Sequence, residues 1–276
     1  TSLESRVFIA LLGGAAGTYA AFGARGPRLQ AALADRLDLQ PAAVPSRTHR
    51  DREAEYVCTL GMLAATGGKI ANELYTLMKQ EFAEASEPVP PGTVGSSTMP
   101  QKRNPILAQD AMASAAQVRA LVPLALDAMM TEHEANRTTS VMMRAAVGPA
   151  AIHTGDILGR LIVIAEGLGV DAARMRENLT LTGGLILSEA VMMELGKSIG
   201  RQLAHDVVYD VTERVMAGAA DFATCLADDP RIAERLSKED LAELLDPSRY
   251  TGACAAMARE QAELARATAA RLSAKP

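Results

Sequence analysis

A long helical repeat of apolar residues in the first third of the chain constrains the fold most. From about Thr48 to Glu84, apolar side chains recur at steps of three and four, the period of an α-helix that buries one face. They include Tyr56, Leu60, Leu63, Ile70, Leu74, Leu77 and Met78. The same phase continues on both sides of Gly67-Gly68, so this pair is expected to lie within the helix. Helices of such length are typical of bundles.

The composition predicts an all-α fold. Aromatic residues make up 3% of the sequence, and thirteen methionines help to fill the core in their place. Alanine, leucine and methionine favour helices, whereas the aromatic and β-branched residues that favour sheets are scarce. Further helices are expected at about residues 3–22, from 27 to 39, 105–133, 140–167, 185–195, 201–216, 238–245 and 252–273. Asp229-Pro230 and Asp246-Pro247 predict turns.

The helix lengths divide the chain into two regions. We expect a central helical bundle over residues 1–170, with a loop at 95–105, and a smaller C-terminal helical domain over 171–276. Apolar positions on more than one face of the long helices predict burial between subunits.

Charge and cysteine content bear on partners and location. A net charge of −5 without a basic stripe argues against nucleic acid. No secretion signal is visible, and no unbroken apolar stretch reaches about 18 residues, so no membrane association is expected. Cys58, Cys225 and Cys254 have neither metal-ligand spacing nor an even disulfide framework, which favours a reducing cytoplasm.

The segment before the second long helix reads Gly-Ser-Ser-Thr-Met-Pro-Gln-Lys-Arg-Asn-Pro over residues 95–105. It supplies two hydroxyls, a mobile cation and a side-chain amide, from Ser96, Ser97, Lys102 and Asn104. Asn104-Pro105 predicts an N-cap followed by a first-turn proline, and a helix N-terminus favours anions. The segment therefore suits a carboxylate that gains charge during a reaction. On composition alone, a serine-rich surface loop with an ordinary helix cap is the favoured interpretation.

The whole eleven-residue string resembles the signature of the fumarase/aspartase superfamily, which includes argininosuccinate and adenylosuccinate lyases and carboxymuconate cycloisomerases. Members are mainly helical homotetramers with three-domain subunits, and each active site is built from three subunits. The resemblance implies the same here, with a small dicarboxylate as substrate. Neither a metal nor an organic cofactor is expected.

The resemblance also implies roles for residues of the loop. Ser96 would be the general base that removes a proton from the carbon next to a carboxylate. Lys102 and Asn104 would hold that carboxylate as it becomes doubly charged, helped by the backbone of Ser97, Thr98 and Met99. A serine hydroxyl acts as a base only where its alkoxide is stabilised, and Lys102 supplies a positive field. No histidine–aspartate pair is apparent near Ser96, which argues against a hydrolase triad.

The start of the long helix carries a second resemblance. Residues 50–56 are similar to a segment of adenylosuccinate lyases and carboxymuconate cycloisomerases that follows a glutamine in contact with substrate. His49 stands at that glutamine position, close to Arg47, and both are candidate substrate contacts or ordinary surface residues. We interpret Arg50, Asp51 and Arg52 as charges that cap a helix end.

A third stretch resembles the phosphate-binding segment of adenylosuccinate lyases. It comprises His133-Glu134, Ser140 and Arg144, and Ala135 stands where that family has an arginine. The missing guanidinium argues against a nucleotide substrate. Ser140 and Arg144 are candidate substrate contacts, although Arg144 could equally be a structural ion-pair partner.

Residues 13–18 and 245–252 are closest to the carboxymuconate cycloisomerase branch, which also covers nitrosuccinate lyases. Our main hypothesis is a β-elimination that releases fumarate from a succinate with a small nitrogen-linked leaving group, with nitrosuccinate as a candidate. One alternative is a 3-carboxy-cis,cis-muconate cycloisomerase. Another is a non-catalytic structural protein on a lyase scaffold.

Family subunits begin with a further domain and a first bundle helix, whose histidine-containing loop contacts substrate. The present sequence starts inside what would be the second bundle helix. We therefore expect the general acid to lie outside these 276 residues, and the chain alone not to turn over substrate.

Overall fold

A computed structural model describes residues 2–89, 92, 98–99 and 101–274 of the chain. About two thirds of it, 67%, is helical and 3% is strand, which confirms the all-α prediction. The chain divides into two compact units, Thr1–Asp171 and Ala172–Pro276.

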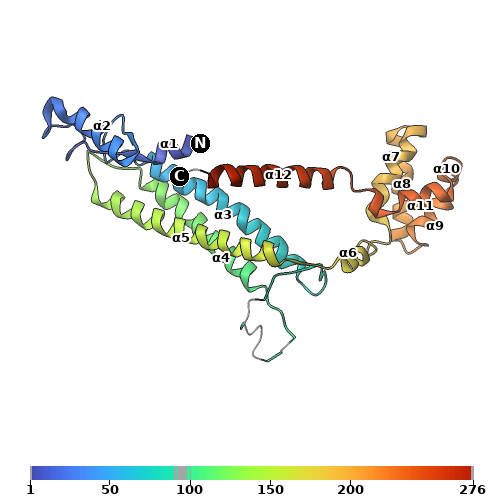
Figure 1. Cartoon of the computed structure of the whole chain (residues 1–276). Helices are drawn as coiled ribbons and strands as arrows, with labels where there is room; N and C mark the ends of the chain where they lie inside the picture. Colours follow the sequence, from blue (N-terminus) through green and yellow to red (C-terminus); the bar gives the residue numbers. More distant parts are fainter. Residues whose placement is uncertain (1, 90–91, 93–97, 100, 275–276) are drawn as a thin grey trace. The chain divides into compact units, whose positions relative to one another are not determined.

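Three long helices form the bundle of the first unit: α3 (Asp51–Leu77), α4 (Ile106–Asp127) and α5 (Arg137–Gly167), which lie side by side (Figure 1). Small residues let them approach closely. A Cβ atom added to Gly68 would lie 2.8 Å from the Cβ of Ala115 on α4, and one added to Gly67 would lie 2.6 Å from Cγ2 of Ile157 on α5. The glycine pair lies within α3, as expected, because it is where α3 meets both neighbours.

The contacts run in opposite directions along α3 and α4. Gly61 meets Val122, whereas Gly68 meets Ala115, so the two helices are antiparallel. The end of α3 and the start of α4 therefore lie at one end of the bundle. The start of α3, the end of α4 and the start of α5 lie at the other.

Short elements cover the start of the bundle: α1 (Ser2–Val7), β1 (Ile9–Ala10), η1 (Gly23–Arg25), α2 (Gly26–Leu37) and β2 (Gln40–Pro41). β1 and β2 pair in parallel. The buried amide of Gln30 links the segments just after the two strands, since it accepts from the Leu12 N–H at 3.1 Å and donates to the Ala42 carbonyl at 2.7 Å.

The expected helix over residues 3–22 is wrong, because α1 ends at Val7. Gly14 and Gly17 have φ angles of 77° and 70°, in the left-handed region that a right-handed helix does not use. Gly13 packs directly against the carbonyl oxygen of Pro45. The glycines do permit a close approach, but within a loop.

The long helices are also shorter than expected at their ends. α3 ends at Leu77 rather than near Glu84, because the chain turns back and the Glu84 N–H donates to the Leu77 carbonyl at 3.0 Å. α4 ends at Asp127 rather than near His133, which has a φ of 56°. β3 (Ala85–Ser86) then pairs antiparallel with β4 (Gly169–Val170), just beyond α5.

The second unit consists of α6 (Ala172–Asn178), η2 (Leu185–Leu187), α7 (Ser188–Ile199), α8 (Arg201–Met216), α9 (Phe222–Ala227), α10 (Pro230–Ala233), α11 (Lys238–Leu244), η3 (Pro247–Arg249) and α12 (Cys254–Ser273). Its core gathers side chains of α7 and α8 around Phe222 and Leu226. Sequence analysis did not predict α6, α9 or α10. Asp229 and Asp246 do stand at turns, where their side chains cap α10 and η3.

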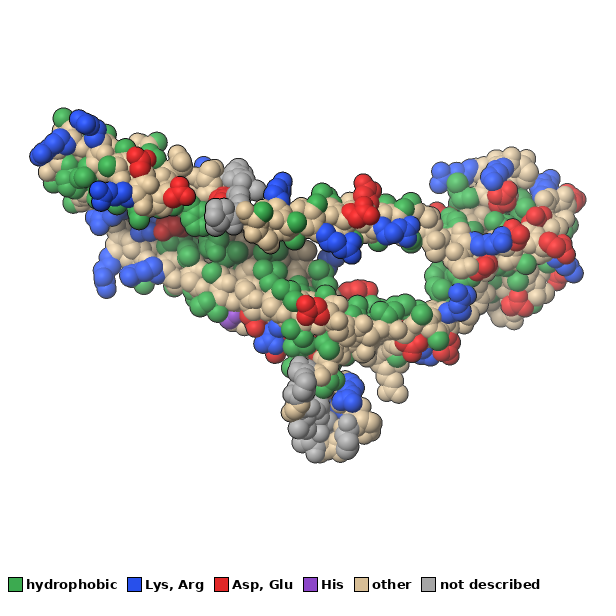
Figure 2. Space-filling view, viewed as in Figure 1, with side chains coloured by type: hydrophobic (Ala, Val, Ile, Leu, Met, Phe, Trp, Pro, Cys, Tyr) green, Lys and Arg blue, Asp and Glu red, His purple; other side chains and the backbone are tan. Residues whose placement is uncertain are grey.

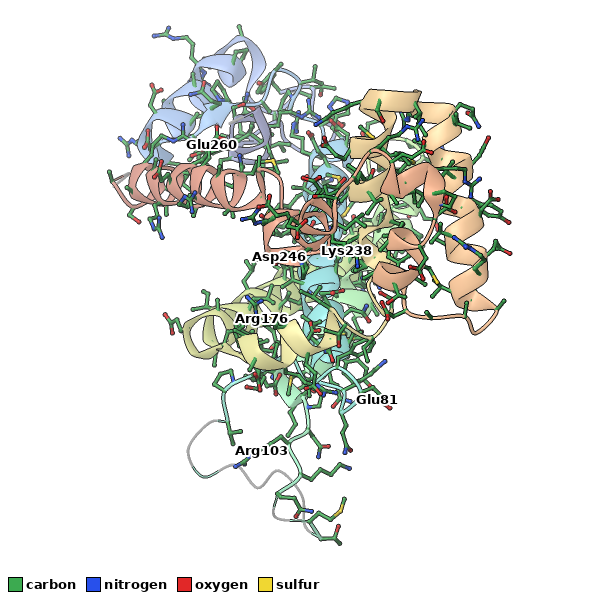
Figure 3. The ribbon with its side chains drawn as sticks, turned by 90° about the vertical axis from the view of Figure 1, so that its right-hand side faces the viewer. Glu81, Arg103, Arg176, Lys238, Asp246 and Glu260 are labelled. Atoms are coloured by element: carbon green, nitrogen blue, oxygen red, sulfur yellow. The ribbon has the colours of Figure 1, made fainter. Side chains whose placement is uncertain are left out.

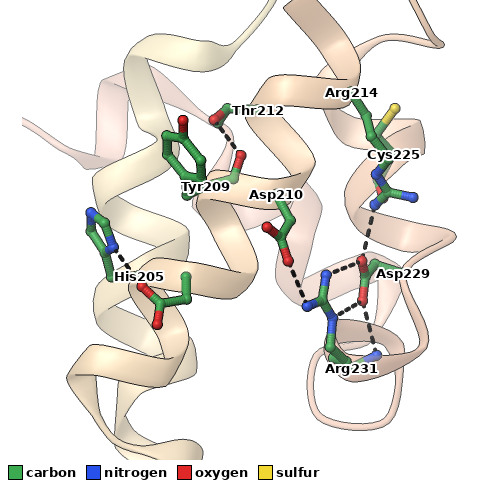
Figure 4. Close-up of polar contacts among 9 residues, drawn as sticks. His205, Tyr209, Asp210, Thr212, Arg214, Cys225, Asp229 and Arg231 are labelled. Carbon is green, nitrogen blue, oxygen red and sulfur yellow. Dashed lines mark hydrogen bonds and ion pairs between the residues drawn. The ribbon is translucent and has the colours of Figure 1, made fainter.

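A network of charges joins α8 to the α9–α10 turn (Figure 4). The carboxylate of Asp229 is buried and accepts from Arg214 at 3.0 Å and from Arg231 at 2.9 Å. Arg231 also pairs with Asp210 on α8, at 2.8 Å. The side-chain hydrogen bonds from Arg231 hold the pKa of Asp229 below its ordinary value, although burial opposes them.

One face of α5 exposes only small or apolar residues, and we call it the α5 stripe. It comprises Val141, Ala145, Gly148, Ile152, Gly155, Gly159 and Ile162. Hydrophobic side chains are prominent over the long helices of this unit (Figure 2). α5 is long and apolar enough to cross a membrane by length and composition, with 22% of its most apolar window buried, although Arg144, Asp156 and Arg160 interrupt its apolar residues. A helix that is apolar on several faces is also what a multisubunit core requires.

Candidate functional site

Part of the signature loop lies within the described residues. Ser96 and Ser97 lie outside them. Thr98, Met99 and Lys102 are exposed and Asn104 is half-buried. This part of the loop lies beyond the end of the bundle where α4 begins, and Figure 3 labels the Arg103 side chain there.

Short-range backbone hydrogen bonds link the described loop residues to one another and to the start of α4. The Lys102 N–H donates to the Met99 carbonyl at 3.0 Å, and the Ile106 N–H donates to the Asn104 carbonyl at 2.9 Å. Asn104 is thus bonded directly to the first residue of α4, whereas the backbone bond of Lys102 lies within the loop.

The N-terminus of α4 is capped differently from the sequence prediction. The helix begins at Ile106, Pro105 is its N-cap, and no side chain of the N-cap residue satisfies it. Glu87 does so instead, since its two carboxylate oxygens accept from the N–H groups of Leu107 and Ala108 at 2.9 and 3.0 Å. We expected this helix N-terminus to attract a substrate anion, but the carboxylate of Glu87 occupies it.

A network of polar side chains joins α4 and α5 a few turns further along. Arg160 of α5 bonds to Asp156 and reaches Asp110 of α4, each at 2.9 Å. Ser114 donates to Asp156 at 2.8 Å. The hydrogen bond from Arg160 is the main reason that the pKa of Asp156 lies below its ordinary value.

The other four predicted contacts gather at the opposite end of the bundle. Arg47, Ser140 and Arg144 line a pocket of about 350 Å³, and Arg47 and His49 line an adjoining one of about 310 Å³. We call the larger one the arginine pocket. It is lined by Arg47, Arg50, Thr131, Ala135, Asn136, Arg137, Ser140 and Arg144.

Hydrogen bonds hold the arginine pocket in shape. Arg50 donates to the Ser140 hydroxyl at 2.8 Å and pairs with Glu53 at 2.9 Å. Ser140 in turn donates to the Asn136 carbonyl at 2.9 Å, and the Asn136 side chain caps α5 by accepting from the Thr138 N–H. Arg47 donates to the Ala15 carbonyl at 2.8 Å.

Sequence reasoning missed two arginines of this pocket. Arg50 was interpreted as a helix-end charge, yet it reaches across to α5, and Arg137 was given no role among the substrate contacts. Arg50 lies just after two candidate contacts, Arg47 and His49, and just before a helix. That position is the one local signal that could have indicated its place in the pocket. Its partner Ser140 lies ninety positions along the chain.

The two groups of candidate residues do not meet within one chain. Lys102 and Asn104 lie near the start of α4, whereas the arginine pocket lies near the start of α3. α3 has 27 residues, and at 1.5 Å per residue it is about 40 Å long. Each end of the bundle therefore presents only part of the predicted contacts.

Metal-binding side chains do not cluster in the described part of the chain: it contains no group of three or more histidine, cysteine, aspartate or glutamate residues placed to hold an ion.

Comparisons with known proteins identify the family of the chain. Residues 1–120 match a family model described as Lyase, and residues 184–260 match one described as Adenylosuccinate lyase C-terminus. A 3-carboxy-cis,cis-muconate cycloisomerase of Bradyrhizobium diazoefficiens is 40% identical over 89% of this chain and 54% of its own length. An N-acetyl-S-(2-succino)cysteine lyase of Enterococcus italicus is 35% identical over 92% of this chain and 56% of its own.

Solved structures give the same result. The 3-carboxy-cis,cis-muconate lactonizing enzyme of Pseudomonas putida superimposes with a TM-score of 0.81 and 38% identity, over 91% of this chain and 56% of that one. The chain thus spans about half the length of the relatives that it matches. It belongs to the fumarase/aspartase superfamily of lyases, in the branch of the carboxymuconate cycloisomerases.

Proposed function

We propose that the protein to which this chain belongs interconverts 3-carboxy-cis,cis-muconate and its lactone. The relatives favour this reaction, the alternative of the sequence analysis, over release of a nitrogen-linked group, because they include cycloisomerases and a lyase that acts on a succinyl thioether. Nitrosuccinate has no support among them. The enzymes among these relatives count against the non-catalytic alternative.

The chemistry needs one proton transfer next to a carboxylate. In the cyclising direction, a substrate carboxylate oxygen adds to a carbon–carbon double bond, and the neighbouring carbon gains a proton. In reverse, a base removes that proton and the carbon–oxygen bond breaks. We assign the proton to Ser96, and stabilisation of the adjacent, charge-gaining carboxylate to Lys102 and Asn104, with the Ser97–Met99 backbone.

The arginine pocket is the observation that carries the proposal. Four guanidinium groups line it, from Arg47, Arg50, Arg137 and Arg144, and no carboxylate is among its lining residues. The proposed substrate carries three carboxylates, so it needs cations beyond Lys102. Arginine holds carboxylates in a planar, two-bond geometry, and the Ser140 hydroxyl and His49 lie beside it as further contacts.

We further propose that complete sites form between subunits of a homo-oligomer, a tetramer by resemblance. Since the loop and the arginine pocket lie at opposite ends of a bundle about 40 Å long, a substrate contacts both only if different subunits supply them. The α5 stripe offers a surface for such an assembly. Its glycines have no neighbouring atom within 4 Å of an added Cβ, which leaves room for another helix. A cytoplasmic location agrees with three free cysteines.

Two experiments test these proposals on the complete enzyme. The first adds 3-carboxy-cis,cis-muconate and follows the loss of the diene's ultraviolet absorbance, with N-acetyl-S-(2-succino)cysteine and fumarate release as the parallel assay. Fumarate release without lactone formation would replace the cycloisomerase assignment by carbon–sulfur elimination, which is the second candidate because of the Enterococcus relative.

The second experiment co-expresses a Lys102→Met variant with an Arg144→Ala variant, and each is expected to lose most of its activity by itself. Mixed oligomers should regain activity, because some of their sites combine an intact loop with an intact pocket. A mixture as inactive as its two components would contradict shared sites.

A further inference from the structure

Glu87 stands between a fixed strand and the signature loop. On one side, Ser86 pairs with Gly169 of β4. On the other, Pro88 packs against Gly167, where an added Cβ would lie 2.6 Å from the proline Cβ. The backbone of Glu87 is thereby held against the C-terminal end of α5.

The side chain of Glu87 spans twenty positions of sequence to reach α4. It is buried, with 8% of the residue exposed, and both oxygens accept backbone N–H groups of the first turn of α4. A carboxylate at a helix N-terminus satisfies donors that the helix leaves unpaired and meets a favourable dipole. Its charge also acts on Arg160 of α5, whose pKa is raised chiefly by its bond to Asp156.

The residues before α4 follow the position of its first turn. The Gln109 N–H donates to the Pro105 carbonyl at 2.9 Å and the Ile106 N–H to that of Asn104. A shift of the first turn would therefore move Asn104, and also Lys102, which lies two residues before it in the chain.

We propose that Glu87 is a positioning residue that fixes the exit of the signature loop, so that Lys102 and Asn104 meet the substrate carboxylate in one arrangement. It also fills the N-terminus of α4, so the substrate carboxylate is directed to the loop and not to the helix end. This inference rests on the proposed role of the loop. Glu87 itself touches no reacting atom.

The test compares Glu87→Ala and Glu87→Gln in the complete enzyme. Alanine removes both hydrogen bonds, whereas glutamine keeps one acceptor and turns a donor toward the second N–H group. We expect kcat to fall about tenfold to a hundredfold in Glu87→Ala, with the oligomer intact, because misplacement by about 1 Å costs such factors. Glu87→Gln should recover part of the loss.

The matched control is Asp221→Ala, which removes another carboxylate cap, the one that accepts from the Thr224 N–H at 3.0 Å in the second unit. It should lower the unfolding midpoint and leave kcat within about twofold. Equal loss of kcat in the control would assign Glu87 a merely structural role. So would a kcat in Glu87→Ala within twofold of wild type, or one that falls only with the folded fraction.

Hydrogen exchange separates this inference from the proposed function. The Leu107 and Ala108 amides should exchange slowest in wild type, faster in Glu87→Gln and fastest in Glu87→Ala, whatever the substrate is. Equal exchange in all three would overturn the positioning role, whereas no turnover of either substrate by wild type would overturn the proposed function alone. If Glu87→Ala does not fold, Glu87→Gln carries the same comparisons.

Discussion

Two carboxylates are buried among the residues that the structure describes, and both cap a helix N-terminus. Glu87 caps α4 from a distance, and Asp229 caps α10 by accepting from the Arg231 N–H at 3.1 Å. A buried carboxylate is stable only where donors or cations replace its water. The sequence indicated a turn at Asp229-Pro230, but it gave no sign that either carboxylate is buried.

Replacing Asp229 by asparagine should destabilise the second unit by about 1–3 kcal/mol, because two arginines lose their charged acceptor. Asp210→Asn is the control, since its carboxylate is 55% exposed and shares only Arg231. There we expect about 0.2–1 kcal/mol. Denaturant unfolding of both variants at neutral pH is the measurement, and equal losses would mean that burial adds nothing.

The paired carboxylate of Asp229 also predicts a pH dependence of the free energy of unfolding. The folded pKa of Asp229 lies below its unfolded value, so its ionised form stabilises the fold above the ordinary aspartate pKa, about 3.9. This contribution is lost as the pH falls through the folded pKa. The stability gap between wild type and Asp229→Asn should thus narrow below about pH 4. A gap that stays constant on acidification would contradict the assignment.

Ser96→Ala tests the proposed base. Removal of a general base commonly lowers kcat by about 100-fold or more, while the oligomer should remain intact. Steady-state kinetics and size-exclusion chromatography of the complete enzyme give both quantities. More than a tenth of the wild-type kcat would transfer the role to Ser97.

Helices with a sustained apolar period are the elements that sequence predicts best here. The period gives α3, α4, α5 and α8, because one buried face fixes the phase of many residues. It fails for α9 and α10, of six and four residues, whose caps and neighbours decide their conformation. It also misleads near Gly13, where apolar content resembles a helix although positive φ angles exclude one.

The residues of the candidate site also fall into two groups: those that a local motif predicts, and those whose roles depend on distant partners. The signature string indicates Ser96, Lys102 and Asn104, because function fixes a local order of residue types. The roles of Arg50 and Glu87 depend on partners ninety and twenty positions away. Such contacts exist only once the helices are packed, so no local pattern contains them.

Gly68→Ala should destabilise the bundle although alanine favours helices. The new methyl group would lie 2.8 Å from the Ala115 Cβ, and overpacking of this kind costs about 1–3 kcal/mol. Combining it with Ala115→Gly should restore part of the loss, measured by a double-mutant cycle of unfolding free energies. Simple additivity of the two changes would show that the helices move apart without strain.

At the scale of the whole molecule, we expect another subunit to bury the exposed α5 stripe. Ile152 is 72% exposed, and Ile152→Asp would place a charge at the centre of the proposed subunit contact. We expect the complete enzyme to dissociate and to lose activity, because an unpaired charge is costly in an apolar interface. Light scattering measures the mass, and Asp35→Lys on the exposed side of α2 is the control. An intact tetramer in Ile152→Asp would place the contact elsewhere.

The length of α3 gives every subunit two unlike ends, one with the loop and one with the arginine pocket. A cell could carry two defective alleles, one with a mutation in the loop and the other with a mutation in the arginine pocket. Its mixed oligomers would still contain some active sites, each built from the intact loop of one chain and the intact pocket of another. Dilution would separate the subunits and so take the shared sites apart. The activity per chain should therefore decrease as the protein is diluted, even when every chain stays folded. Catalysis would then belong to the encounter between chains and not to any one of them.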